Sequence, residues 1–179
     1  MTQKPITKEY LERAGLYYLS RYSSSEQNFR EVLRRKVMRR TDAFSSIKDL
    51  HQEWIEDVVT KCLRLGYIDD LLYATQKIRA MQHAGKSTNA IKNMLRMKGV
   101  SQDIATKAFS EVNGGEEESP DVRAAFVYAR KRRFGPYRQL KATDDLATVK
   151  KKEFASMARV GFRFDVIKNV IDAESEPEF

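Results

Sequence analysis

The sequence repeats itself at an interval of 62 residues, and this limits the available folds more than any other feature. Residues 99–104 (GVSQDI) align without gaps on residues 161–166 (GFRFDV). The same interval carries Leu33 to Leu95 and Leu95 to Met157, so the step occurs twice. One such unit buries too little surface alone, and neighbouring units must stack to complete a core. The sequence therefore predicts a tandem array of three units.

Apolar residues recur at helical spacing along nearly the whole chain. The clearest stripe consists of Phe29, Val32, Leu33 and Val37, and others lie within 11–22, 50–65 and 104–112. No stretch alternates like a strand, and 8 Gly and 4 Pro in 179 residues are too few for a β-sandwich or barrel. We expect an all-α fold, an elongated array of three tandem three-helix repeats.

Capping signals mark the predicted helix ends. Residues 24–27 (SSEQ) fit a capping box, and residues 119–121 (SPD) place a cap, a proline and an acid at a helix start. Gly66, Gly99 and Gly161 each follow an apolar stretch, where a left-handed terminator belongs.

These signals define one solenoid-like domain. Its predicted bounds are 1–179 for the whole, 7–66, 67–113 and 119–173 for the repeats, and 174–179 for an acidic tail. The Gly- and Glu-rich stretch 113–119 is a linker by composition. We interpret residues 172–179 as a frayed end.

The composition is basic and poor in metal ligands. With 33 Lys+Arg against 25 Asp+Glu, the net charge is +8, which favours nucleic acid or an acidic protein surface as partner. A single cysteine, Cys62, and two histidines, His51 and His83, exclude a disulfide framework and leave too few ligands for most zinc sites. The sequence shows neither a membrane-spanning apolar run nor a secretory signal, so we expect a soluble, cytoplasmic protein without membrane contact.

Catalytic motifs are weak. No phosphate-binding Gly-x-x-x-x-Gly-Lys-Ser/Thr loop occurs, and His51 is interpreted as a surface or partly buried histidine. Asp69 and Asp70 are adjacent and do not face each other on a helix, so capping is the better interpretation than metal binding. Cys62 and Trp54 lie on an apolar stripe and are expected in the core. We predict no active site, no cofactor, no metal and no enzymatic activity.

The strongest charge feature is a run of six cations within eleven residues. They are Arg30, Arg34, Arg35, Lys36, Arg39 and Arg40. Lys36 and Arg40 lie nearer the apolar stripe than the others and must extend past it to reach water. Two interpretations stay open: an ordinary solvated face near a helix C-terminus, or contact with the phosphates or acidic side chains of a partner.

Further basic clusters follow on the other repeats. They comprise Lys92, Arg96 and Lys98 on the middle repeat, and Arg130, Lys131, Arg132, Arg133 and Lys150–Lys152 on the third. Arginines beside Phe134 and Tyr137 suit phosphate contact with base stacking, and suit equally a helix end whose aromatic rings pack inward. Basic patches on successive repeats would make an extended positive surface for a long anion such as single- or double-stranded DNA.

Several segments resemble the RecX family. Residues 18–24 (YLSRYSS) and 33–36 (LRRK) resemble its opening motif, and 65–70 (LGYIDD) with Tyr73 and Ala74 resembles its most diagnostic segment. Further similarities lie at Gly85–Ser87, Ile91, Leu95, Lys98–Val100, Gly135–Pro136 and Gly161–Phe162, so that the resemblance spans about residues 10–171. Met94 and Val160 depart from the family pattern, which often has an acid and a basic residue at these positions.

The resemblance implies a function as well as a fold. RecX proteins consist of three three-helix repeats and dock in the groove of the RecA–single-stranded DNA filament as non-enzymatic modulators. They inhibit RecA's ATPase, strand exchange and co-protease activity, and some members bind DNA directly. We therefore expect a monomeric regulator whose partners are the RecA filament and DNA. The alternative is a sequence-nonspecific DNA-binding or architectural protein that acts without RecA.

Overall fold

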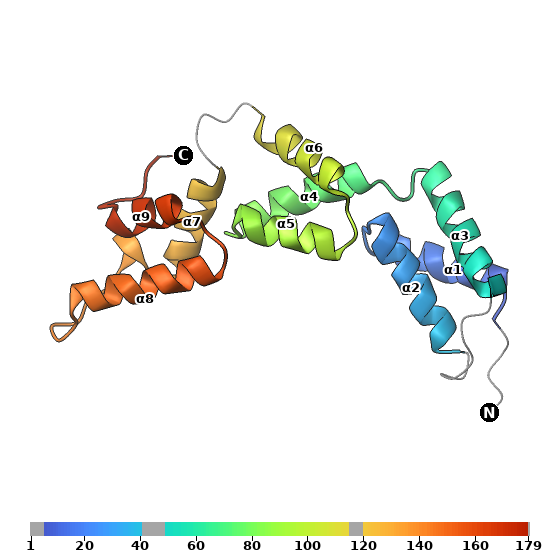
Figure 1. Ribbon diagram of the computed structural model, residues 1–179, viewed down its shortest axis with the longest axis horizontal. Helices are drawn as coiled ribbons and strands as arrows, with labels where there is room; N and C mark the ends of the chain where they lie inside the picture. The colour runs from blue at the N-terminus through green and yellow to red at the C-terminus, as the bar shows by residue number, and fades with distance from the viewer. Residues whose placement is uncertain (1–5, 41–48, 115–119, 179) are drawn as a thin grey trace. The chain divides into compact units, whose positions relative to one another are not determined.

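The structure, a computed structural model, describes residues 6–40, 49–114 and 120–178 (Figure 1). In these residues the only regular elements are helices, which confirms the all-α prediction. They are α1 (Lys8–Leu19), α2 (Glu26–Met38), α3 (Asp49–Arg64), α4 (Asp70–His83), α5 (Thr88–Met97), α6 (Gln102–Asn113), α7 (Pro120–Arg132), the 3₁₀ turn η1 (Gly135–Tyr137), α8 (Leu146–Arg159) and α9 (Phe164–Asp172).

Most helix ends follow the capping signals. Gly66, Gly99 and Gly161 have φ angles of +71°, +75° and +91°, as expected of left-handed terminators. The cap of α2 is Ser25, whose Oγ accepts the Asn28 N–H, so the helix begins one residue later than the predicted capping box implies.

The second predicted start signal is only partly described. The helix α7 begins at Pro120, as the sequence predicts, while its expected cap, Ser119, lies outside the described residues. Residues 115–119 of the predicted linker lie outside them as well.

The described residues form two compact units. The first comprises those up to Ala74 together with Leu95–Ala105, and the second Thr75–Met94 together with those from Thr106 onward. The boundary between the units passes through α4, α5 and α6. Each unit therefore contains one terminal group of three helices and part of the middle group.

The core of the first unit lies among α1, α2 and α3. Its fully buried side chains include Leu11, Phe29, Leu33 and Ile55. Burying each such side chain stabilises the fold by about 1.5–3 kcal/mol. Cys62 is buried in this core, as predicted, and burial raises the pKa of its thiol. Trp54 packs against the core but stays partly exposed.

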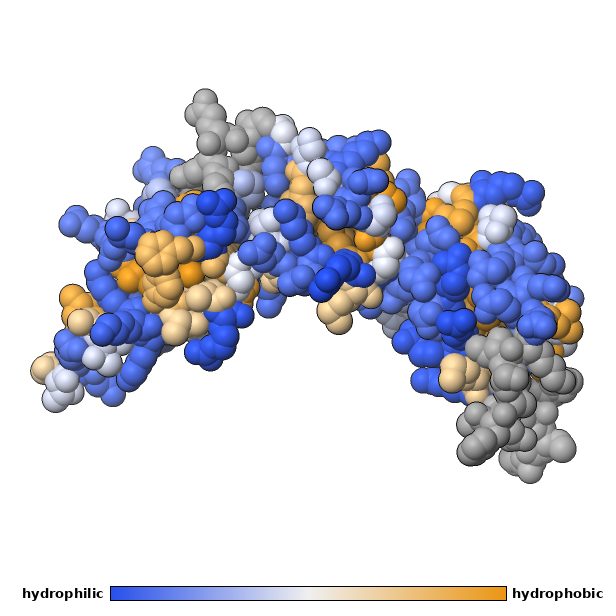
Figure 2. All heavy atoms as spheres, viewed as in Figure 1, coloured by the Kyte–Doolittle hydropathy of each residue, from blue (hydrophilic) through white to orange (hydrophobic). Residues whose placement is uncertain are grey.

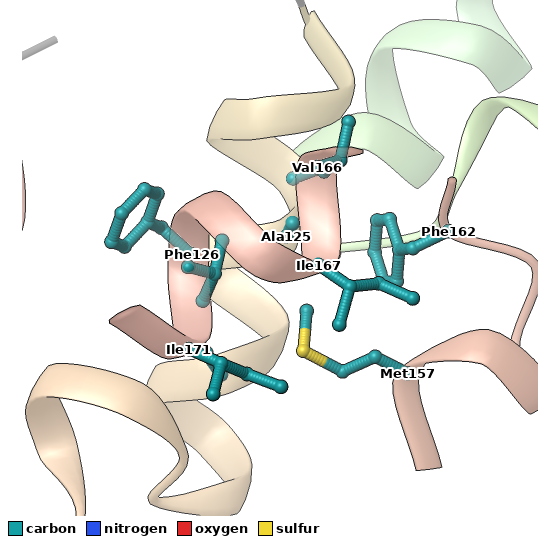
Figure 3. Close-up of a cluster of buried hydrophobic side chains, with 10 residues drawn as sticks. Ala125, Phe126, Met157, Phe162, Val166, Ile167 and Ile171 are labelled. Atoms are coloured by element: carbon teal, nitrogen blue, oxygen red, sulfur yellow. The ribbon is translucent and has the colours of Figure 1, made fainter. Parts of the chain in front are cut away.

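The core of the second unit lies among α7, α8 and α9 (Figure 3). Phe126 from α7, Met157 from α8 and Ile167 from α9 are almost completely buried in it. Met157 is the third member of the series that starts with Leu33 and Leu95, and all three have an exposed fraction of 0%. The interval of 62 residues thus relates three fully buried core positions.

The first unit contains a hydrogen-bonded junction between the first helices and the middle ones. Ser25 Oγ donates to the Lys98 carbonyl, and the Glu26 N–H donates to Asp70 Oδ1 at 2.7 Å. Asp69 Oδ1 accepts the Leu72 N–H at 2.9 Å and caps its own helix, α4. The expectation that one of the two aspartates caps a helix is therefore confirmed, and Asp70 caps a different helix, α2.

The second unit contains a junction with the same arrangement. Ser87 Oγ donates to the Val160 carbonyl at 2.7 Å, and the Thr88 N–H donates to Asp121 Oδ1 at 2.6 Å. Asp121 lies in the first turn of α7, as expected, and it is also buried and caps α5. Ser25 and Ser87 lie one 62-residue interval apart, as do Lys98 and Val160, so the repeat in the sequence reappears as a repeated junction.

Each junction requires a glycine. A Cβ atom on Gly99 would lie 2.3 Å from Gln27 Cβ, and one on Gly161 would lie 2.9 Å from Ser87 Oγ. These distances are shorter than van der Waals contact, so the terminating glycines also permit the close approach of the serine-capped helix.

Candidate nucleic-acid interface

The six-cation run on α2 is divided between structural and exposed side chains. Arg30 is mostly buried: its Nε lies 2.8 Å from Glu56 Oε1 and its Nη2 lies 2.7 Å from Glu26 Oε1. The two carboxylates raise the pKa of Arg30 above its ordinary value. Because Glu56 belongs to α3, Arg30 ties α2 to α3. Most N–H donors of its guanidinium already bind carboxylates, so few remain for a phosphate.

The other cations of this run are more accessible. Arg34 Nη1 lies 3.3 Å from Glu31 Oε1, and the Arg40 guanidinium lies 3.8 Å from the centre of the Tyr10 ring. Arg35 and Arg39 are exposed and one turn apart, while Lys36 is half-buried. The visible face of α2 is mostly hydrophilic (Figure 2).

The middle cluster has three cations along α5 and its end. Lys92 is exposed, with its Nζ 5.6 Å from the centre of the Phe109 ring. Arg96 is exposed. Lys98 Nζ donates to Asn28 Oδ1 at 3.0 Å, so this lysine lies at the first junction.

The third cluster, at the end of α7, is tied to its surroundings at several points. Lys131 Nζ donates to the Ala84 carbonyl at 3.0 Å. The Arg132 guanidinium lies 5.8 Å from the centre of the Phe134 ring, and Arg133 Nη1 lies 3.5 Å from Gln139 Oε1.

Arg130 links this cluster to the C-terminal segment. It forms an ion pair with Glu176, and its guanidinium lies 5.7 Å from the centre of the Tyr137 ring. Both Tyr137 and Phe134 pack against the core, which favours the interpretation that the aromatic rings face inward.

The acidic C-terminal segment is therefore not simply frayed. Besides the Arg130–Glu176 pair, Lys150 Nζ lies 2.7 Å from Asp172 Oδ1, and Asp172 is the last residue of α9. Two acids of the predicted frayed end are thus held by cations of the predicted basic patches, and these ion pairs reduce the positive charge available to a partner.

A buried ion pair escapes sequence reasoning. Glu153 follows three lysines and looks solvated, yet its side chain is only 4% exposed and that of Arg138 only 13%. Arg138 Nε and Nη2 donate to the two carboxylate oxygens at 2.8 and 2.5 Å, and the Gly135 N–H donates to one of them at 3.2 Å. Glu153 lies one turn before Met157, which places it on the apolar side of α8 and is the signal that could have found it.

The described residues also bear on metal and membrane sites. In that part of the chain, no group of three or more His, Cys, Asp or Glu side chains could hold a metal ion. None of the helices described there is long and apolar enough to cross a membrane.

Comparison with known proteins decides the family. Residues 69–108 match the model of the second three-helix domain of RecX. The chain is 33% identical over 170 residues to the regulatory protein RecX of Myxococcus xanthus (strain DK1622), covering 95% of this chain and 88% of that protein. The chain belongs to the RecX family. It is also 31% identical to the regulatory protein RecX of Agrobacterium fabrum (strain C58 / ATCC 33970), with 93% and 84% coverage.

Solved RecX structures have the same fold. The crystal structure of RecX from Lactobacillus salivarius superposes with a TM-score of 0.66 at 22% identity, covering 93% of this chain and 96% of that one. A second crystal structure of a regulatory protein RecX superposes with a TM-score of 0.68 at 20% identity, covering 93% of this chain and 73% of that one. The prediction of tandem three-helix repeats is confirmed, and the chain is a non-enzymatic regulator of the RecX type.

The segment that most resembles RecX, residues 65–70, builds the first junction. Gly66 ends α3, Ile68 is buried in the core, and Asp70 caps α2. Tyr67 contributes nothing to this burial, since it is 56% exposed. The diagnostic residues of this RecX protein are therefore mainly those that join its repeats.

Proposed function

We propose that this RecX protein binds the RecA–single-stranded DNA filament and mostly inhibits its ATPase, strand exchange and co-protease activity by docking in the filament groove. Similarity to regulatory RecX proteins over 95% of the chain is the observation that carries the proposal. In this proposal the protein acts in the cytoplasm as a monomer without a cofactor, and its three repeats span about residues 7–66, 67–113 and 119–173.

The exposed cations are the proposed contacts with the filament. Arg35 on α2, Arg39 just after it, Arg96 on α5 and Arg132 on α7 are exposed, and an exposed guanidinium binds phosphate without first losing a buried partner. Arg30 has a different proposed role, since it holds α2 against α3.

The function is tested by titrating RecA with the full-length protein and measuring ATP hydrolysis on single-stranded DNA. Binding that bridges several filament subunits should inhibit at less than one molecule per several RecA subunits, with DNA sites in excess. If inhibition instead follows DNA coverage and disappears when free DNA is added, the protein acts as a DNA competitor, and the alternative of a plain DNA-binding protein is correct.

A further inference from the structure

The end of α1 exposes two tyrosines beside an arginine. Tyr17 and Tyr22 are 59% and 57% exposed. The Arg21 guanidinium lies 4.7 Å from the centre of the Tyr17 ring, and Arg21 is itself exposed. Large aromatic side chains normally bury most of their surface, so two exposed rings beside a cation indicate a binding surface.

The ring of Tyr22 is held by a column of aromatic rings that reaches the core. Its centre lies 5.2 Å from that of Tyr18, and the Tyr18 ring lies 6.3 Å from the buried Phe29 ring, with 27° between the planes. Asn28 Nδ2 donates to the Tyr18 hydroxyl at 3.2 Å and fixes the middle ring. Tyr22 is therefore exposed yet supported, which lowers the entropy lost when a ligand stacks on it.

A second cation lies beside this column. The side chain of Asn28, whose Nδ2 donates to the Tyr18 hydroxyl, also accepts at Oδ1 a hydrogen bond from the Lys98 ammonium at 3.0 Å. Positive charge therefore lies beside both exposed rings: Arg21 against Tyr17, and Lys98 one hydrogen-bonded residue away from the Tyr18–Tyr22 column. Aromatic rings combined with cations are the arrangement with which proteins bind single-stranded nucleic acid, because bases stack on the rings while the cations neutralise the phosphates.

The fold does not require these rings. The second junction makes the same two types of hydrogen bond as the first, from Ser87 and Thr88. The residues that precede it, 79–86 (RAMQHAGK), include no aromatic side chain of the Phe, Tyr or Trp type. Since one junction forms without neighbouring tyrosines, those beside the other have a role beyond joining the repeats.

We propose that Tyr17 and Tyr22, with Arg21 and Lys98, form a stacking site for the bases of single-stranded DNA, here named the tyrosine platform. This deepens the proposed function, because single-stranded DNA is one component of the filament. A protein surface is the less favoured ligand, since cations beside exposed rings can neutralise phosphates while the rings stack on any base.

The test measures binding of the full-length protein, without RecA, to fluorescent oligo(dT) and to an oligonucleotide of equal length made of abasic sites. We expect the wild type to prefer oligo(dT). Tyr17→Ala and Tyr22→Ala should each weaken oligo(dT) binding by about five-fold or more and leave abasic binding unchanged. Tyr22→Phe keeps the ring and should bind like the wild type. Tyr67→Ala removes an equally exposed tyrosine outside the platform and should have no effect.

Each contrary outcome has a separate meaning. If the wild type does not prefer oligo(dT), or if the alanine variants retain the preference, the platform does not stack bases and this proposal is wrong. If these variants bind oligo(dT) normally but no longer inhibit RecA, the platform contacts protein, and the proposal is wrong while the proposed function stands. If the stacking preference is present but the wild type never inhibits RecA, the platform stands and the proposed function fails.

Discussion

At the scale of single residues, the Arg138–Glu153 pair carries the largest expected energetic effect. Arg138→Met leaves a buried carboxylate whose remaining described donor is the Gly135 N–H. We expect the free energy of unfolding to fall by about 3–5 kcal/mol, measured by urea denaturation. The double variant Arg138→Met, Glu153→Leu should recover most of this loss.

An exposed pair provides the control for this prediction. Arg163 and Asp165 lie 3.1 Å apart with side chains 70% and 63% exposed, so Arg163→Met should cost no more than about 1 kcal/mol. Equal losses in the two single variants would contradict the view that burial makes the Arg138–Glu153 pair important.

Asp70 predicts a pH dependence of stability. Burial raises the pKa of Asp70 above its ordinary value, although the Glu26 N–H opposes this shift. The folded state therefore holds the proton more tightly than the unfolded state, and the contribution of Asp70 to stability falls as the pH rises from its ordinary value through the raised one. Asp70→Asn keeps the acceptor oxygen without the charge.

The Asp70 prediction is measured by urea denaturation at pH 3 and pH 7. The free energy of unfolding of Asp70→Asn minus that of the wild type should be larger at pH 7 than at pH 3. Asp69→Asn, on the same turn but exposed, controls for loss of a negative charge near a helix start. A stability difference between Asp70→Asn and the wild type that is the same at both pH values would show that burial does not destabilise the charged form of Asp70.

The exposed arginines of α2 separate binding from stability. Arg35→Glu with Arg39→Glu should weaken binding to DNA and to the filament. The dependence of log K on log salt should become shallower by about 0.7 for each phosphate that the variant no longer neutralises. The free energy of unfolding should change by no more than about 0.5 kcal/mol per substitution.

A control variant, Lys107→Glu with Arg159→Glu, makes the same charge change at exposed positions outside the predicted patches. If both pairs reduce binding equally, only net charge matters.

The sequence could not sort the cations into these roles. Arg30 and Arg35 look alike on the helical face, and only the position of Glu56, 26 residues beyond Arg30, makes one structural. The sequence pattern at Arg130–Arg133 suits base stacking and inward packing equally, whereas the more exposed rings lie at Tyr17 and Tyr22. In the sequence Tyr22 stands out only as part of an apolar stripe and a family motif, and Tyr17 belongs to neither, because exposure depends on the packing of the neighbouring helices.

At the scale of helices, the junctions depend on how closely a terminating glycine approaches the capped helix. Gly99→Ala forces a Cβ against Gln27 and strains a residue at φ +75°. Gly66→Ala imposes the same kind of strain at φ +71° but meets nothing within 4 Å. We expect Gly66→Ala to lower the free energy of unfolding by about 1–2 kcal/mol and Gly99→Ala by at least about 1 kcal/mol more. Equal effects in urea denaturation would mean that the Gly99 junction tolerates a Cβ.

Helix existence and helix ends were predictable because their signals are local. Terminating glycines and the proline of α7 act within one turn, so the chain around them is enough to identify them. The caps that join repeats are not local: Asp70 serves a donor 44 residues away and Asp121 one 33 residues away. The sequence identifies an aspartate as a capping residue, but tertiary packing determines which helix it caps.

At the scale of the whole molecule, the repeats are expected to act together on the filament. Each presents a few exposed cations, and each contact alone would be weak. Contacts held in a fixed arrangement bind as intramolecular events after the first, so their combined affinity far exceeds that of any one. The junctions supply this fixed arrangement within each unit, because each combines a serine hydrogen bond, an aspartate cap and the close approach of a glycine to the capped helix.

Loosening one junction should therefore reduce regulation more than it reduces folding. Gly161→Ala places a Cβ 2.9 Å from Ser87 Oγ and disturbs the second junction while leaving the first intact. We expect the concentration that half-inhibits RecA's ATPase on single-stranded DNA to rise by about ten-fold or more, with helical content by circular dichroism nearly unchanged. Gly66→Ala, which carries the same kind of backbone strain but meets nothing within 4 Å, should inhibit like the wild type. Should Gly161→Ala inhibit as strongly as Gly66→Ala, the repeats bind independently, and the geometry of the second junction serves stability alone.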